Sequence, residues 1–282
     1  MYYIIVMISV IMFGVQFLLN DRYEKLSGNH AGATFAFSFL SSAAGFLCLL
    51  AINRFRLEWT PFTALCALAS ALNSLLYTVC SLKALSRINL SLYSLFSMLG
   101  GMLLPFLLGL IFYGESLTVG KVVCVVLIAA ALVLSVSGKV RSKGMIFYIG
   151  IFILNGMSGV IAKLFESAPY LKTGAAGFSI LSTATTALIS GVILLVIRKR
   201  FPRPKGKAII FALCGGLFSP VANFLLLIAL AVLPASTQYP MVTGGVMIVS
   251  TVFAMVIGQK PSRREILAVS LSFLGLLALV LF

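Results

Sequence analysis

Charged side chains are scarce in this sequence, and acidic ones are the scarcest of all. Only 10% of the 282 residues are charged, and six of these residues are aspartate or glutamate. A soluble domain of this length needs far more polar surface, so a water-exposed globular fold is excluded. The apolar share of 61% and the mean hydropathy of +1.14 instead predict a chain whose solvent is a lipid bilayer.

Groups that enzymes commonly use are missing in the arrangements that chemistry requires. The single histidine, His30, lies in a polar loop, so a zinc site built from clustered histidines is excluded. Neither a P-loop nor a pair of intramembrane aspartates occurs. The five cysteines lie in apolar runs without a CxxC pair and are expected to be small buried side chains: Cys48, Cys66, Cys80, Cys124 and Cys214. We predict a protein that is not an enzyme, with no catalytic residue, metal or cofactor.

Lysine and arginine outnumber the acidic residues and give a formal net charge of +15. They lie between apolar runs rather than on one basic surface with interleaved aromatics, which argues against nucleic-acid binding. The apolar runs are continuous and do not alternate with period two, so an outer-membrane barrel is excluded. The first run lacks the basic start and cleavage site of a signal peptide, and we expect it to be a retained helix.

Ten apolar segments are long enough to span a bilayer, at roughly 17 to 25 residues each. The first five lie near residues 3–19, 31–52, 61–82, 92–113 and 117–136. The second five lie near residues 144–164, 173–197, 208–230, 236–257 and 266–282. The sequence therefore predicts an all-α integral membrane protein with ten transmembrane helices.

The two halves of the chain resemble one another at an offset of about 145 residues. The aligned pairs include Ser74 and Ser219, Ala84-Leu85 and Ala229-Leu230, Gly100-Gly101 and Gly244-Gly245, and Gly114-Glu115 and Gly258-Gln259. We predict two five-helix repeats, at residues 1–138 and 139–282. An odd number of helices inserts the second repeat with opposite orientation, and this inverted plan is typical of secondary transporters with a solute site between the repeats.

Several of these features resemble EamA-type transporters, a branch of the drug/metabolite transporter superfamily. They are Ala84-Leu85 closing the third run, Pro105 within the fourth, Gly114-Glu115-Ser116-Leu117 after it, and a fifth run that opens near Gly120. The resemblance covers nearly the whole chain and implies a ten-helix transporter of metabolites, amino acids or drugs with both termini in the cytoplasm. Two residues depart from the pattern. Gln259 replaces the acidic residue in the second copy, and Gln16 occupies the first helix, where the related small multidrug exporters carry a glutamate.

The distribution of basic residues favours the opposite orientation. Most lysines and arginines lie in the odd-numbered loops, including the dense segment 198–207. By the positive-inside rule these loops are cytoplasmic, which places both termini outside. Both orientations are open at this stage.

Polar side chains recur at helical spacing within the apolar runs, as Ser70, Asn73, Ser74, Tyr77 and Ser81 do in the third. Such faces should turn to the bundle interior, because lipid offers no hydrogen-bond partner. The candidates for solute contact are Gln16, Asn73, Tyr77, Ser94, Ser97, Asn155, Asn223, Gln238, Tyr239 and Thr243. Helix packing and core hydrogen bonding are the alternative roles of these side chains.

Lys163 is the deepest charge in the predicted helices. We expect it to snorkel to the interface and to form an ion pair with Glu166, three residues later. Its alternative role is to act as the counter-ion of an anionic solute.

The function that fits this pattern is alternating-access transport of a small metabolite, amino acid or drug-like solute, in the cell membrane. A flippase for a lipid-linked group and a non-transporting scaffold subunit have the same composition. The scaffold predicts an interior closed by large apolar side chains, and the flippase predicts a cavity open sideways to lipid. The expected partners are the solute and membrane lipids, without nucleic acid, and a homodimer is left open.

Overall fold

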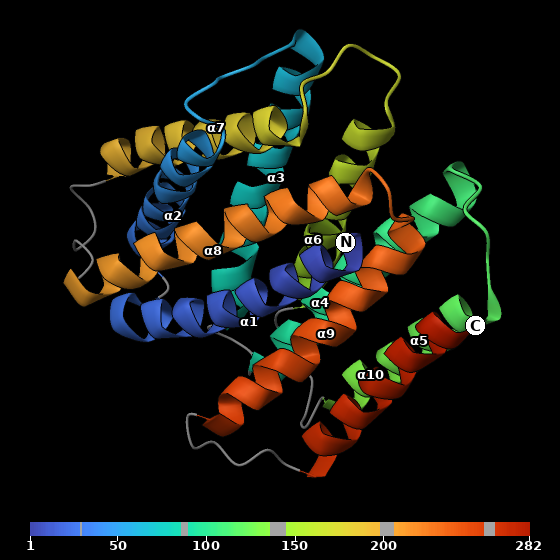
Figure 1. Ribbon diagram of the computed structural model, residues 1–282. Helices are drawn as coiled ribbons and strands as arrows, with labels where there is room; N and C mark the ends of the chain where they lie inside the picture. Colours follow the sequence, from blue (N-terminus) through green and yellow to red (C-terminus); the bar gives the residue numbers. More distant parts are fainter. Residues whose placement is uncertain (29, 86–89, 136–144, 198–205, 257–262) are drawn as a thin grey trace.

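The computed structural model describes residues 1–28, 30–85, 90–135, 145–197, 206–256 and 263–282 (Figure 1). These residues form ten α-helices and no β-strand. The helices are α1 (Tyr2–Ser27), α2 (Ala31–Ile52), α3 (Pro61–Leu85), α4 (Leu90–Phe112), α5 (Val119–Ser135), α6 (Met145–Ser167), α7 (Ala175–Ile197), α8 (Gly206–Leu230), α9 (Ala235–Val256) and α10 (Arg263–Leu281). Six of them, α1, α2, α3, α6, α7 and α8, are long and apolar enough to cross a membrane. The chain is therefore an all-α membrane protein, as its composition predicts.

Helices α2 and α3 begin after residues whose side chains satisfy one of the first backbone amides. The Nδ1 atom of His30 accepts a hydrogen bond from the Ala33 amide at 3.1 Å at the start of α2. Thr60 does the same for the Thr63 amide at 3.2 Å, directly before Pro61 opens α3. Helix α9 is different, because Pro234 precedes it and offers no side-chain acceptor. Its first amides therefore need an acceptor from elsewhere in the fold.

Helix α1 is longer than the sequence predicts. The apolar run ends near Leu19, but the helix continues to Ser27, about two turns further. This extension packs inside the protein, because Tyr23 is only 2% exposed and its hydroxyl donates to the carbonyl of Ala33 at 2.7 Å. The ring of Phe37 lies 4.8 Å from the Tyr23 ring, centroid to centroid. Hydropathy marks the membrane-embedded length of α1 and misses the part that packs beyond it.

Large apolar side chains that repeat every three or four residues mark the outer faces of the helices. The exposed residues of α3 are Leu65, Leu68, Leu72 and Leu76, and those of α8 are Ile210, Leu213 and Leu217. A stripe of this kind is unfavourable in water and favourable in lipid. These stripes therefore define the lipid-facing side of each helix.

The helices form a central group flanked by two peripheral pairs. Helix α1 packs on α8 and α9, and helix α6 packs on α3 and α4. In Figure 1, α1, α8 and α9 cross in front of α3, α4 and α6. The pair α5 and α10 lies on one side of this group, and α2 and α7 lie together on the other.

Two of the central helix pairs are held close together by glycine. A Cβ on Gly101 of α4 would lie 2.6 Å from Nδ2 of Asn155 on α6. A Cβ on Gly245 of α9 would lie 3.0 Å from Val10 of α1. Gly100 is tighter still, because a Cβ there would overlap the main chain of Phe152. The doubled glycines of the sequence therefore let α4 approach α6 and let α9 approach α1.

Both termini lie at one end of the bundle, together with the loops that follow α2, α4, α6 and α8 (Figure 1). We call this the terminal end. The opposite end, at which α1, α3, α5, α7 and α9 finish, we call the basic end, because 16 of the 21 lysine and arginine residues belong to the connections between helices at this end or to the adjoining helix ends. The predicted boundary between residues 138 and 139 lies outside the described residues.

Candidate functional site

Three of the predicted polar residues meet where α3, α4 and α6 pack together. The hydroxyl of Tyr77 lies 2.8 Å from Oγ of Ser97, which is 2% exposed. Nδ2 of Asn155 donates to the main-chain carbonyl of Ser97 at 2.6 Å. The three side chains thus join three helices in one hydrogen-bonded group, a common role for polar residues between membrane helices.

Asn73 also joins helices. Its Nδ2 donates to the carbonyl of Leu154 and to Oγ of Ser158, both at 2.9 Å and both on α6. The residue is 8% exposed. Because both amide protons are bound to α6, Asn73 tethers α3 to α6.

On α9 the predicted residues bond to the neighbouring helices. Gln238 is completely buried, and its Nε2 donates to the carbonyl of Leu226 on α8 at 2.9 Å. Its Oε1 accepts no hydrogen bond in the described structure. The hydroxyl of Tyr239 donates to the carbonyl of Gly159 on α6 at 3.1 Å, and Thr243 is 7% exposed. Helix α9 is therefore attached to both α8 and α6 by polar side chains.

The remaining predicted residues have fewer contacts. Gln16 is half-buried on α1. Asn223 is exposed, and its Nδ2 bonds only within α8, to the carbonyl of Ser219 at 2.9 Å. The side chain of Ser94 is not among those described. Asn223 thus keeps an exposed amide.

Three polar side chains are exposed halfway along helix faces that are otherwise buried. They are Ser74 on α3, Ser158 on α6 and Asn223 on α8. Each of them has one buried neighbour seven positions before it and another seven positions after it, which is two turns away on the same helix face. The buried neighbours are Ala67 and Ser81 on α3, Ile151 and Phe165 on α6, and Gly216 and Leu230 on α8.

This exposure does not face lipid. Ser74 lies nine residues from Leu65, which places it about 180° around the helix from the exposed leucines. Ser158 accepts a hydrogen bond from Asn73 on α3, and Asn223 lies about 120° around α8 from the exposed Leu217. We therefore interpret the three side chains as accessible polar surface on the inner side of the bundle. The polar spacing of the third apolar run placed Ser74 on a polar face but did not distinguish it from its bonded neighbours Asn73 and Tyr77.

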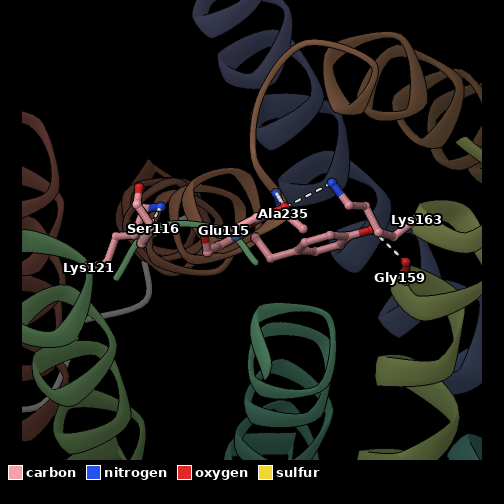
Figure 2. Close-up of polar contacts among 8 residues, drawn as sticks. Glu115, Ser116, Lys121, Gly159, Lys163 and Ala235 are labelled. Atoms are coloured by element: carbon pink, nitrogen blue, oxygen red, sulfur yellow. Dashed lines mark hydrogen bonds and ion pairs between the residues drawn. The ribbon is translucent and has the colours of Figure 1, made fainter. Parts of the chain in front are cut away.

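A buried charge cluster lies at the terminal end (Figure 2). Glu115 lies in the loop between α4 and α5, and its Oε1 is 2.8 Å from Nζ of Lys163 on α6. The same oxygen accepts the amide of Ala235 at 3.0 Å, and Oε2 accepts the amide of Ser236 at 2.9 Å. Glu115 thus supplies the acceptor that Pro234 cannot, and it places a negative charge at the positive end of the α9 dipole.

Both members of this ion pair are largely buried. The side chains of Lys163 and Glu115 are 12% and 9% exposed, and the Lys163 ammonium lies 5.1 Å from the centroid of the Tyr113 ring. The predicted ion pair with Glu166 is therefore wrong, because a carboxylate 48 positions away in sequence reaches Lys163 instead. A lysine held in this way is also unsuited to being the free counter-ion of a solute.

The Glu115 carboxyl is held in its charged form. Burial is the largest single influence and raises its pKa. The hydrogen bonds from Lys163 and from the amides of Ser236 and Ala235 together outweigh burial, so the pKa is lowered below the ordinary value of 4.5. The carboxylate is therefore ionised at neutral pH.

The Gly114-Glu115 motif shapes the turn that presents this carboxylate. Gly114 has a φ of +58°, a left-handed conformation that favours glycine. The Glu115 amide donates to the carbonyl of Gly109 at 3.1 Å, and a Cβ on Gly109 would lie 2.6 Å from Oε2 of Glu115. Nζ of Lys121 donates to the carbonyl of Ser116 at 2.7 Å and fastens the loop to α5 (Figure 2). This turn therefore positions the Glu115 carboxylate against the start of α9.

Other polar contacts tie the α6–α7 connection at the same end. Nζ of Lys172 donates to the carbonyls of Phe165 at 3.0 Å and of Ala168 at 3.2 Å, which caps the end of α6. The amide of Thr173 donates to Oγ1 of Thr63 at the start of α3, at 3.0 Å. The terminal end is thus closely bonded across several helices.

A shallow pocket of about 450 Å³ also opens at the terminal end, away from the predicted site residues. Tyr2, Glu166 and Lys172 line its polar side, and Leu227 and Ile228 line its apolar side. Lys172 is already bonded to main-chain carbonyls, so the pocket offers little fixed polar chemistry.

Comparisons with known proteins identify the fold. No family model matches the sequence, and no curated protein gives a significant match. Solved structures do match, in 28 chains. One, described only as "Crystal structure of protein", aligns with a TM-score of 0.78 over 98% of this chain and 95% of that chain, at 15% sequence identity. Likeness at this identity establishes a shared fold over nearly the full length and leaves the activity to be argued from the residues.

Proposed function

We propose that this chain is a secondary transporter that moves a small metabolite, amino acid or drug-like solute across the cell membrane by alternating access. The observation that carries the proposal is the inward exposure of Ser74, Ser158 and Asn223. Polar surface that is accessible inside a membrane bundle needs a polar occupant, since lipid cannot satisfy it. Hydroxyl and amide groups suit an uncharged or zwitterionic polar solute.

The proposal includes two inverted five-helix repeats, and related contacts in the two halves support it. Gly101 approaches Asn155, and Gly245 approaches Val10, so each doubled glycine meets the first helix of the other repeat at a corresponding position.

A second pair of contacts follows the same rule. Gly159 of α6 approaches Pro105 of α4, and Gly14 of α1 approaches Val249 of α9, at 2.5 and 2.7 Å from the added Cβ atoms. All four positions correspond at an offset of about 145 residues. Inverted repeats of this kind can exchange conformations, which is the basis of alternating access.

The EamA-like motifs belong to the same proposal. The turn at Gly114-Glu115-Ser116 holds a carboxylate against α9, a role that fits a motif placed between the fourth and fifth helices. A scaffold subunit is less well supported, because its interior should be closed by large apolar side chains, whereas α3, α6 and α8 expose polar groups inward.

The test begins with the purified wild-type protein in detergent. Small polar and amphipathic solutes are screened by thermal shift, and compounds that stabilise the protein are then assayed for uptake into proteoliposomes. We expect Asn223→Leu to remove the stabilisation by the solute while the ligand-free midpoint stays close to wild type. Stabilisation that persists in Asn223→Leu, or binding without uptake, would contradict a solute path along this face.

A further inference from the structure

The Glu115 cluster joins the two proposed repeats at one end of the bundle. Glu115 belongs to the first repeat, whereas Lys163 and the amides of Ala235 and Ser236 belong to the second. One carboxylate is therefore bonded to both α6 and α9 of the other half. While these bonds hold, the α4–α5 loop, α6 and α9 cannot separate at the terminal end.

The corresponding positions of the other repeat carry no charge. At the offsets that relate the two halves, Glu115 corresponds to Gln259, and Lys163 corresponds to Leu18 on α1. Gln259 lies outside the described residues, so this comparison concerns residue types alone. An amide and a leucine cannot form an ion pair, and a neutral amide is a weaker partner for a helix N-terminus than a carboxylate.

We infer that the Glu115–Lys163 pair is a charged gate at the terminal end, with uncharged residue types at the corresponding positions of the other repeat, and that it biases the resting transporter toward a state closed there and accessible from the basic end. The inference rests on the proposed transport function. The two ends of an inverted repeat would otherwise be equivalent, so an ion pair that the residue types at these corresponding positions allow in one repeat and not in the other favours the state closed at the terminal end. Opening the terminal end requires Lys163 and Glu115, both largely buried, to lose each other as partners.

The inner side of the bundle is consistent with this bias. Ser74, Ser158 and Asn223 are exposed even though polar contacts tie the terminal end across α3, α4, α6, α7 and α9. Access from the basic end accounts for both observations.

Labelling of one inward-facing cysteine tests the gate without a known solute. In a background whose five native cysteines are replaced, Ser74→Cys is reconstituted in sealed vesicles, and a membrane-impermeant maleimide is added from either face. We expect labelling from the basic end to be at least about tenfold faster than from the terminal end, in line with a gate that suppresses the open state by that factor.

The gate variants should then reduce or remove this difference. Glu115→Gln is expected to accelerate labelling from the terminal end by about tenfold or more. Lys163→Gln provides a second test that keeps the Glu115 bonds to α9, and it should act in the same direction. Glu58→Gln removes an exposed carboxylate in the loop that follows α2 at the same end, and it should leave both rates unchanged. Each protein is first shown to be monodisperse and folded.

The outcomes separate the gate from the transport proposal. Equal labelling from both faces in the Ser74→Cys protein that keeps Glu115 and Lys163 would overturn the gate. Labelling rates that neither Glu115→Gln nor Lys163→Gln changes would overturn it as well. A Ser74→Cys thiol that reacts from neither face, with or without the gate variants, would show that the inner surface is not accessible, and it would overturn the transport proposal as well.

Discussion

Removing both members of the Glu115–Lys163 pair should cost less stability than the two single removals added together. Glu115→Gln leaves the Lys163 ammonium 12% exposed without a carboxylate, and it removes the negative charge from the start of α9. Loss of one partner from a buried pair costs about 3 to 5 kcal/mol, and the lower end applies here because the loop lies near water. We expect about 3 kcal/mol for Glu115→Gln.

Lys163→Met should cost less, at about 2 kcal/mol, because the carboxylate keeps its hydrogen bonds from Ala235 and Ser236. Methionine also preserves the apolar stem that packs near Tyr113. In the double variant neither charge is left unpaired, and the amide oxygen that Glu115→Gln introduces can still accept one main-chain amide. The double variant should lose about 3 kcal/mol of stability, whereas the two single losses add to about 5 kcal/mol. The difference is a coupling energy of about 2 kcal/mol between Glu115 and Lys163.

The assay is a double-mutant cycle on purified protein in one detergent, with unfolding followed at fixed protein concentration and pH 7. Glu58→Gln combined with Lys163→Met supplies the control cycle, in which the two effects should add. A Glu115–Lys163 coupling below about 0.5 kcal/mol would show that the pair behaves like a screened surface contact, and it would refute the energetic argument.

Three further predictions concern transport and pH. Ser74→Leu should reduce uptake of an identified solute at least about tenfold, whereas Ser270→Leu, on the exposed outer face of α10, should not; equal effects would contradict an inward path. Because the folded pKa of Glu115 is lowered, its stabilisation is present above pH 4.5 and is lost as the pH falls through the folded value. The difference in thermal midpoint between wild type and Glu115→Gln should therefore shrink below pH 4.5, and a constant difference would contradict the assignment. An imposed pH gradient should change uptake only weakly, since Glu115 is paired and the other acidic residues lie at helix ends or in loops; accumulation that an uncoupler abolishes would refute this.

The sequence predicted the positions of the helices well, because hydropathy reports directly on the length of chain that lipid can accommodate. Most predicted boundaries lie within a few residues of those in the structure. The largest difference occurs at α1, whose last two turns carry polar residues such as Arg22 and Lys25. That extension is stabilised by packing of Tyr23 on Phe37, a tertiary contact that local hydropathy does not encode.

The polar stripes identified helix faces but not the roles of individual side chains. Asn73 and Asn155 were predicted from the cost of burying an amide, and the structure satisfies both amides on neighbouring helices. Ser74 lies one residue from Asn73 and is exposed instead. Periodicity gives the direction of a side chain, whereas the presence of a partner depends on how far the next helix is.

The charge cluster shows why pairing was harder to predict than placement. Helical spacing favoured Glu166 as the partner of Lys163, because residues three apart on one helix are neighbours. The structure instead brings Glu115 from the loop between α4 and α5, where it bonds both to Lys163 and to the uncapped start of α9. A signal for this contact was nevertheless present in the sequence, since the duplicated motif reads Gly-Glu in one half and Gly-Gln in the other. Under the proposed duplication the two copies should share their geometry, so this difference in charge is the asymmetry that the proposed gate uses.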